Sequence, residues 1–192
     1  MESQVLRTLV KNIYMKQLFT AILLFITLCG YCERKSSLPY DSTAKKFIID
    51  TVIEAESKTK DALHSLVIEW IALNYKSAND VIQLNDKENG TIIAKGVYVN
   101  VIFAPVLALG YEVGHTLTIK IKDNKIKVTI DNLKYEYFDK GHHSYSLESL
   151  LITKPVLAKK QMITFEHNIN KRLSATIEEI SKYINTTVKN DW

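Results

Sequence analysis

The sequence is almost without cysteine. Among its 192 residues there are two, Cys29 and Cys32, and both lie near the amino terminus. No disulfide can therefore link two segments beyond residue 32, so we expect the folded part of the chain to be stabilised by its core alone. The stretch 45–192 has the commonest size of a single domain and is long enough to bury such a core.

A large excess of one charge is missing too. Lys and Arg number 25 and Asp and Glu 21, which gives a net charge of +4. Residues 1–31 hold three of the basic residues and one of the acidic ones, so the remainder carries a net charge of +2. Proteins that bind nucleic acid typically have a strongly basic surface. We therefore expect no nucleic-acid partner.

Motifs for catalysis and metal binding are also missing. There is no Gly-x-Ser-x-Gly, no His-Glu-x-x-His and no glycine cluster for phosphates or dinucleotides. His142 and His143 are adjacent, and they match no known ligand spacing. The sequence therefore predicts no cofactor and no metal, and it does not favour an enzyme. An enzyme of unrecognised type would need a cleft that joins distant residues, for example His115, Glu136 and His142.

What the sequence does have at its start is an export signal. Met15-Lys16 precedes an apolar run from Leu18 to Leu28. This run is too short to cross a bilayer comfortably, since a spanning helix needs about 20 apolar residues. A charged start, a short apolar run and a break are typical of a signal peptide. We expect residues 1–32 to be that signal, with Met15 as the true start, and the protein to be periplasmic or a membrane-anchored lipoprotein.

Three fates of the signal remain open. Cys32 is a candidate for lipidation, although Tyr31 stands where lipoprotein signals have a small residue. Simple cleavage in the region 27–30 and an uncleaved apolar anchor are the alternatives.

Beyond the signal, the pattern predicts a polar tether over residues 33–44 and a single α+β domain over 45–192. Helical spacing of apolar residues indicates two helices, and alternation and turn residues indicate five strands. The economical packing is an antiparallel sheet with both helices on one face. The expected order is strand 47–55, helix 60–75, strands 80–84, 91–102, 117–122 and 125–130, an irregular stretch 139–164, and helix 166–189.

The second hairpin has the clearest alternation. Asp123-Asn124 supplies its two-residue turn, and isoleucine, leucine and valine alternate with lysine on either side. This alternation is typical of a sheet with one face on a core and one in water. The side expected to face water carries four lysines: Lys120, Lys122, Lys125 and Lys127.

Four local features together are similar to a known domain family. They are the helix around Trp70, the strand Asp80-Val81-Ile82, the Gly90–Gly96 hairpin return and the turn Lys122-Asp123-Asn124-Lys125. Over residues 47–138 they resemble DUF4468, an uncharacterised Bacteroidetes family. The resemblance implies a TBP-like fold, a curved antiparallel sheet with two helices packed on one face. It implies no activity, because none is established for the family. Where the family pattern often has Arg-Tyr after the turn, this chain has Lys127-Val128, so no role of that arginine carries over.

Two segments are candidates for binding a partner. The four lysines would suit an anionic partner such as lipid headgroups or an acidic glycan, although a solvated sheet face is the plainer interpretation. The stretch 103–110 is apolar where a polar loop is expected, and an exposed patch would suit a partner; a loop folded over the core is the alternative. Its large side chains include Phe103, Val106, Leu107 and Leu109.

From these features we expect a binding or adaptor domain of the cell envelope, which contacts an envelope protein or a membrane surface. The first alternative is a carrier of a small lipid or glycan, and the second is the enzyme of unrecognised type. The oligomeric state is left open.

Overall fold

The computed structural model describes residues 16–17, 36–99, 103–104, 109–110, 112–138, 141–153 and 159–187. Contacts divide the chain into two units, residues 1–35 and 36–192. The second unit contains the whole hydrophobic core, which runs from Leu38 to Ile184. It is therefore a domain that can be considered by itself. In the described part of the chain, no helix has the length and apolar character needed to span a membrane.

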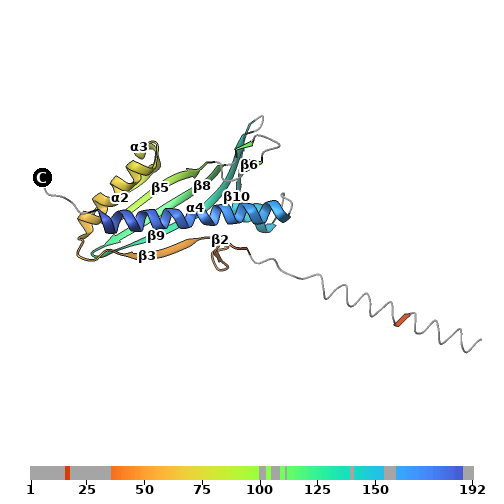
Figure 1. Cartoon of the computed structure of the whole chain (residues 1–192), viewed down its shortest axis with the longest axis horizontal. Coiled ribbons are helices and arrows are strands. Elements are labelled where there is room, and N and C mark those ends of the chain that lie inside the picture. Colours follow the sequence, from red (N-terminus) through yellow and green to blue (C-terminus); the bar gives the residue numbers. More distant parts are fainter. Residues whose placement is uncertain are drawn as a thin grey trace, which may run out of the picture. The chain divides into compact units, whose positions relative to one another are not determined.

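The domain is an antiparallel sheet covered by helices (Figure 1). The strand order is β10-β9-β8-β5-β4, and β3 pairs with the half of β9 that β10 leaves free. The α+β architecture predicted from the sequence, an antiparallel sheet with helices packed on one face, is confirmed. The sheet strands and the helices are β3 (Ile49–Glu54), α2 (Lys60–Asn74), α3 (Ala78–Val81), β4 (Ile82–Asp86), β5 (Thr91–Tyr98), β8 (Glu112–Lys122), β9 (Lys125–Phe138), β10 (His142–Ser146), a π-helical turn (Ser149–Thr153) and α4 (Lys159–Thr186).

Helix α2 begins where the sequence predicts. The Thr59 hydroxyl oxygen accepts a hydrogen bond from the Ala62 N–H at 3.3 Å and so caps the helix, and Asp61 lies in its first turn. One stripe of α2 then reaches the core, including Leu63, Val67 and Trp70. The predicted helix 60–75 ends one residue earlier than expected.

Helix α4 runs along the same face of the sheet as α2 (Figure 1). Its buried positions recur at three- and four-residue steps: Phe165, Ile169, Leu173, Thr176, Ile180 and Ile184. The Phe165 ring meets the Tyr135 ring of β9 edge to face, with centroids 5.7 Å apart. At the other end of the helix, the Asn185 side-chain amide donates a hydrogen bond to the Glu54 carbonyl of β3 at 3.2 Å. The helix therefore spans the sheet from β9 to the end of β3.

The described part of the predicted tether packs on the domain. Residues 40–41 (β1) and 46–47 (β2) form a two-stranded hairpin, and Leu38 is buried beside them. The buried carboxylate of Glu166 on α4 accepts hydrogen bonds from the Ser37 N–H and hydroxyl. These contacts join residues 129 positions apart, so no local sequence pattern could predict them.

Several other segments differ from the expected elements. Residues 80–81, expected to begin a strand, belong to the short helix α3, and the strand β4 starts only at Ile82. Strand β5 ends at Tyr98 instead of residue 102, β8 begins at Glu112 instead of residue 117, and β9 ends at Phe138 instead of residue 130. The stretch 139–164, expected to be irregular, contains β10, the π-helical turn and the start of α4. Pairing with β9 supplies the hydrogen bonds that make β10 a strand, although its sequence lacks an apolar alternation.

Candidate functional site

The four lysines predicted to face water form a compact block on the face of the sheet opposite the helices. They are Lys120, Lys122, Lys125 and Lys127, all exposed, and we call them the lysine block. Lys120 lies directly opposite Lys127 across β8 and β9, and Lys122 lies opposite Lys125. Directly opposed side chains have Cβ atoms about 5 Å apart, where like charges destabilise the pairing. The two lysine pairs are therefore neighbours on β8 and β9, and the like charges within each pair repel each other.

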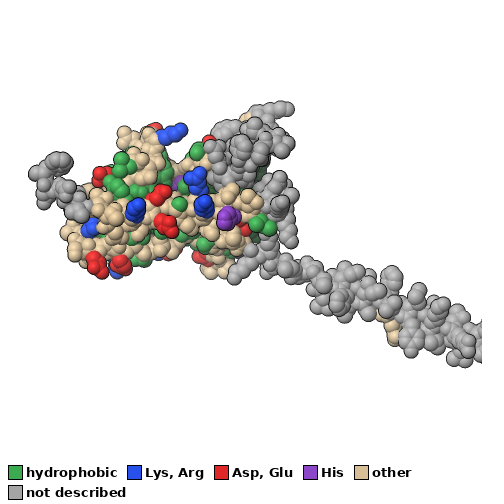
Figure 2. All heavy atoms as spheres, viewed as in Figure 1, with side chains coloured by type: hydrophobic (Ala, Val, Ile, Leu, Met, Phe, Trp, Pro, Cys, Tyr) green, Lys and Arg blue, Asp and Glu red, His purple; other side chains and the backbone are tan. Residues whose placement is uncertain are grey.

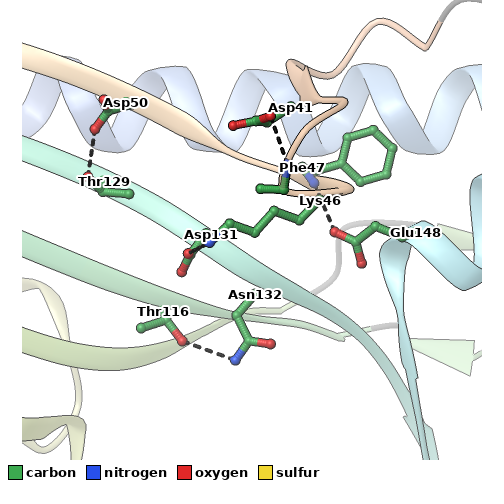
Figure 3. A network of polar contacts seen from close by, with 10 residues as sticks. Asp41, Lys46, Phe47, Asp50, Thr116, Thr129, Asp131, Asn132 and Glu148 are labelled. Atoms are coloured by element: carbon green, nitrogen blue, oxygen red, sulfur yellow. Dashed lines mark hydrogen bonds and ion pairs between the residues drawn. The ribbon is translucent and has the colours of Figure 1, made fainter.

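Strand β3 neutralises one side of the block. The Lys127 ammonium lies 2.9 Å from a carboxylate oxygen of Asp50, and the Thr129 hydroxyl donates to the other oxygen at 2.7 Å. Figure 3 shows Asp50 and Thr129 facing each other across β3 and β9. The bond from Lys127, followed by that from Thr129, lowers the pKa of Asp50 below its ordinary value. Glu54 stands opposite Lys125 in the same register.

The side of the block on β8 has no such partner. No carboxylate of the described residues lies within ion-pair distance of Lys120 or Lys122. The neighbour of Lys120 on β5 is Thr91, a neutral residue. Two ammonium groups are therefore left to water or to an anion from outside the domain.

Exposed aliphatic side chains lie on the same face as the block. Val52 is 53 % exposed and lies directly opposite Lys127. Leu84 on β4 is 42 % exposed and lies opposite Ile93 of β5. Val97 on β5 is 47 % exposed, and its neighbours Gly96 and Tyr98 point to the helices. The open face therefore combines a basic corner with scattered apolar side chains.

Farther along β9, the polar groups are already paired within the domain. The Lys46 ammonium binds the Asp131 carboxylate, the Glu148 carboxylate accepts the Phe47 N–H at 2.9 Å, and Asn132 donates to the Thr116 hydroxyl (Figure 3). The hydrogen bond to Asp131 raises the pKa of Lys46. This network fastens the β1–β2 hairpin to the sheet, so its charges are not available to a partner.

The described part of the helix side has no comparable basic patch. Figure 2 shows basic and acidic side chains intermixed over α4. Lys171, Arg172, Glu178 and Glu179 are all exposed there. Mixed charge of this kind is the ordinary solvated surface of a helix.

On the covered face, sequence reasoning missed a buried histidine among aromatic rings. His115 of β8 is stacked on Tyr98 with ring centroids 4.1 Å apart, and its Nε2 lies 3.1 Å from the Tyr75 hydroxyl oxygen. Trp70 packs edge to face on Tyr75, and the Tyr98 hydroxyl is bonded to the Thr176 hydroxyl at 2.9 Å. The alternation of β8 could have found it, since His115 is in phase with the buried Val113 and Leu117.

Burial dominates the electrostatics of this cluster. It lowers the pKa of His115 to about 4, and the nearby Val113 backbone, which favours the protonated ring, offsets only part of the effect. Nδ1 makes no hydrogen bond of ordinary geometry with the described residues. Burial also raises the pKa of Tyr98 to about 12 and that of Tyr75 further. The cluster is thus neutral near pH 7 and forms part of the core.

The three residues suggested for an enzyme cleft do not meet. Glu136 and His142 are neighbours on β9 and β10, with 3.6 Å between the carboxylate and Nε2. His142 is half exposed, whereas His115 is buried under the helices. Among the described residues, no group of three or more His, Cys, Asp or Glu side chains is arranged to hold a metal ion.

The other sequence candidates lie partly or wholly outside the described residues. Phe103 and Leu109 contribute backbone to the small strands β6 (Phe103–Ala104) and β7 (Leu109–Gly110), which pair with each other. Val106, Leu107 and Cys32 lie outside the described residues. Their predicted roles stay predictions.

Comparison with known proteins identifies the domain. The profile of a family described as a domain of unknown function, DUF4468, with TBP-like fold matches residues 50–136. Over residues 50–136 the domain is similar to the DUF4468 family. The resemblance predicted from the sequence is confirmed. No curated protein matches the chain at a significant level.

Two solved structures share the fold of this domain. A DUF4468 family protein from Bacteroides ovatus has a TM-score of 0.62 at 12 % identity, with 80 % of this chain and 94 % of that chain covered. A TBP-like protein from Parabacteroides distasonis has a TM-score of 0.65 at 14 % identity, with 79 % and 99 % covered. At such identities the likeness concerns the fold alone.

Proposed function

We propose that this protein is exported and that its DUF4468-like domain is a binding or adaptor module of the cell envelope. The open face of the sheet would be its contact surface. The observation that carries the proposal is the unneutralised half of the lysine block, Lys120 and Lys122, on a sheet face that no helix covers. The signal-like segment 1–32, with Cys32 as a lipidation site, supports the envelope as the place of action.

The geometry favours binding through the open face over binding through the helix face. Like charges opposed across strands weaken the sheet. An anionic or acidic surface would remove this repulsion on contact. The mixed charges over α4 offer no such gain to a partner.

The experiment measures binding of residues 36–192 to envelope membranes prepared from a Bacteroides species. We expect the double variant Lys120→Glu/Lys122→Glu to lose most of the binding. The matched control is Lys171→Glu/Lys182→Glu, which makes the same change of charge on exposed positions of α4. Equal binding by wild type and both variants would refute a role of the open face.

A further inference from the structure

We infer that the partner of the lysine block is the surface of an anionic phospholipid bilayer. This inference rests on the proposed function and names the chemistry that the open face would contact. It draws on three separate features: unpaired ammonium groups, exposed aliphatic side chains beside them, and the place where the chain enters the domain.

The first feature is charge. Lys120 and Lys122 have no carboxylate within ion-pair distance among the described residues, and Lys125 and Lys127 extend the same block. Each basic residue close to an anionic leaflet strengthens binding about fivefold. The block consists of two cross-strand lysine pairs on one face of the sheet, so an anionic surface laid against that face would contact all four side chains. A bilayer presents its phosphates in such a plane.

The second feature separates a bilayer from a soluble polyanion. Val52 is directly opposite Lys127, and more than half of its side chain is exposed. Farther across the same face, Leu84 on β4 and Val97 on β5 are also exposed; Val97 pairs with Gly114, six residues before Lys120 on β8. A soluble acidic polymer gains little from aliphatic side chains, whereas a membrane interface accepts them next to basic residues.

The third feature is the entry of the chain. Three residues separate Cys32 from Ser36, and Ser37 is bonded to Glu166 near one end of α4. The lysine block lies at the other end, where Asn185 of α4 is bonded to Glu54, opposite Lys125. Glu166 and Asn185 are about 29 Å apart along the helix. Ser37, at the start of the described domain, and the lysine block therefore lie toward opposite ends of α4.

The test uses residues 36–192, which contain the whole core and lack the apolar signal. Co-sedimentation is measured with vesicles of phosphatidylcholine alone and with vesicles containing about one third phosphatidylglycerol. We expect binding to the anionic vesicles only, with strong weakening at about 0.5 M salt. Lys120→Glu/Lys122→Glu should reduce the partition at least about tenfold, and Lys171→Glu/Lys182→Glu should leave it within about twofold.

The apolar contribution has its own variant. Val52→Ser with Val97→Ser should weaken binding to anionic vesicles severalfold, while binding of a soluble sulfated polysaccharide, if any is detected, should not change. Far-UV circular dichroism of each variant checks that it folds.

The outcomes separate the inference from the proposed function. Lysine-dependent binding to the polysaccharide but not to vesicles overturns the bilayer as partner and leaves a soluble polyanion. Lysine-dependent binding to envelope membranes without binding to either probe overturns it in favour of a protein partner. In both cases the proposed function stands. The proposed function itself is refuted only if Lys120→Glu/Lys122→Glu binds envelope membranes as well as the wild type does.

Discussion

The buried ring of His115 should make the domain less stable as the pH falls from 6.5 towards 4. In the folded state the ring is enclosed by Tyr75, Tyr98 and the strand backbone, and burial holds its pKa at about 4 instead of 6.5. In the unfolded chain the ring is solvated and takes up a proton near pH 6.5. Between these values the unfolded state binds one proton more than the folded state, so stability rises with pH.

The magnitude follows from the two pKa values. Each pH unit of difference corresponds to about 1.4 kcal/mol, so the drop from 6.5 to about 4 corresponds to about 3 kcal/mol. This stability is fully present above pH 6.5 and is lost by about pH 4, below which His115 contributes no further change. Against a typical total of about 5–15 kcal/mol, the loss is large.

The two tyrosines that enclose the ring do not titrate in this window. The phenol pKa values of Tyr75 and Tyr98 are both raised, so these side chains stay neutral throughout. The carboxyl pKa values of Asp41, Asp50 and Asp86 are lowered below 3.8, so these groups lose their stabilising contribution mainly at more acidic pH.

The assay is urea unfolding of residues 36–192 at a series of pH values from about 7 to about 4.5. His115→Gln removes the titrating ring and keeps a polar group near the Tyr75 hydroxyl. We expect this variant to be less stable at pH 7 and to lose much less stability on acidification. His167→Gln, at an exposed position of α4, is the control and should follow the wild type. If wild type and His115→Gln show the same slope, the buried ring does not cause the pH dependence.

Two further predictions concern packing. Gly96→Ala should destabilise the domain by about 1–3 kcal/mol in urea unfolding, because the added methyl group would lie 2.6 Å from the His115 ring and also overlap Tyr75. Gly114→Ala is the control and should cost far less, because the nearest atom at Gly114 is the flexible tip of Glu136 at 3.3 Å. Phe47→Ala should cost about 3–5 kcal/mol, because the ring is 1 % exposed and belongs to the core; a loss below about 1 kcal/mol would mean that the β1–β2 hairpin is not part of the cooperative unit.

The elements that the sequence predicted well are those with strong local signals. The helical spacing around Trp70 placed α2 within one residue of its end, and Asp123-Asn124 marked the turn between β8 and β9. In both cases the decisive interactions join residues close in the chain. The turn has Asn124 at a φ of 64°, a conformation that asparagine tolerates better than most residues.

The elements that were missed depend on contacts distant in the sequence. The hairpin of β1 and β2 has only two residues in each strand, and it is held by Ser37 on Glu166, by Lys46 on Asp131 and by the buried ring of Phe47. Likewise β10 is a strand because β9 offers it an edge. A pattern within a few residues carries no information about such partners, so these segments looked like tether or irregular chain.

The candidate site was predicted only in part, because some of its features also depend on contacts between distant segments. Alternation along β8 and β9 placed the four lysines on one face, and the structure agrees. The sequence pattern could not show that Lys127 has an acidic partner whereas Lys120 and Lys122 have none among the described residues. This difference depends on β3 lying beside β9, which brings Asp50 to Lys127. The buried His115 was within reach, since it shares the phase of Leu117, but a histidine among apolar residues of a strand was not recognised as core.

Strand β8 gives the strongest argument that the open face acts on something outside the domain. At one end of that face β8 carries Thr116 and Thr118, which are partly exposed and electrically neutral, and at the other end Lys120 and Lys122. Threonine suits a strand at least as well as lysine, so the fold itself would be served by threonine at all four positions. At the last two positions β8 instead has Lys120 and Lys122. These lie opposite Lys127 and Lys125 of β9, and the like charges weaken the pairing of the two strands. Helix α4 already covers the other face, and β3 neutralises only the far side of the block. The positive charge that remains thus destabilises the isolated domain, and an anionic surface against the open face would remove this repulsion.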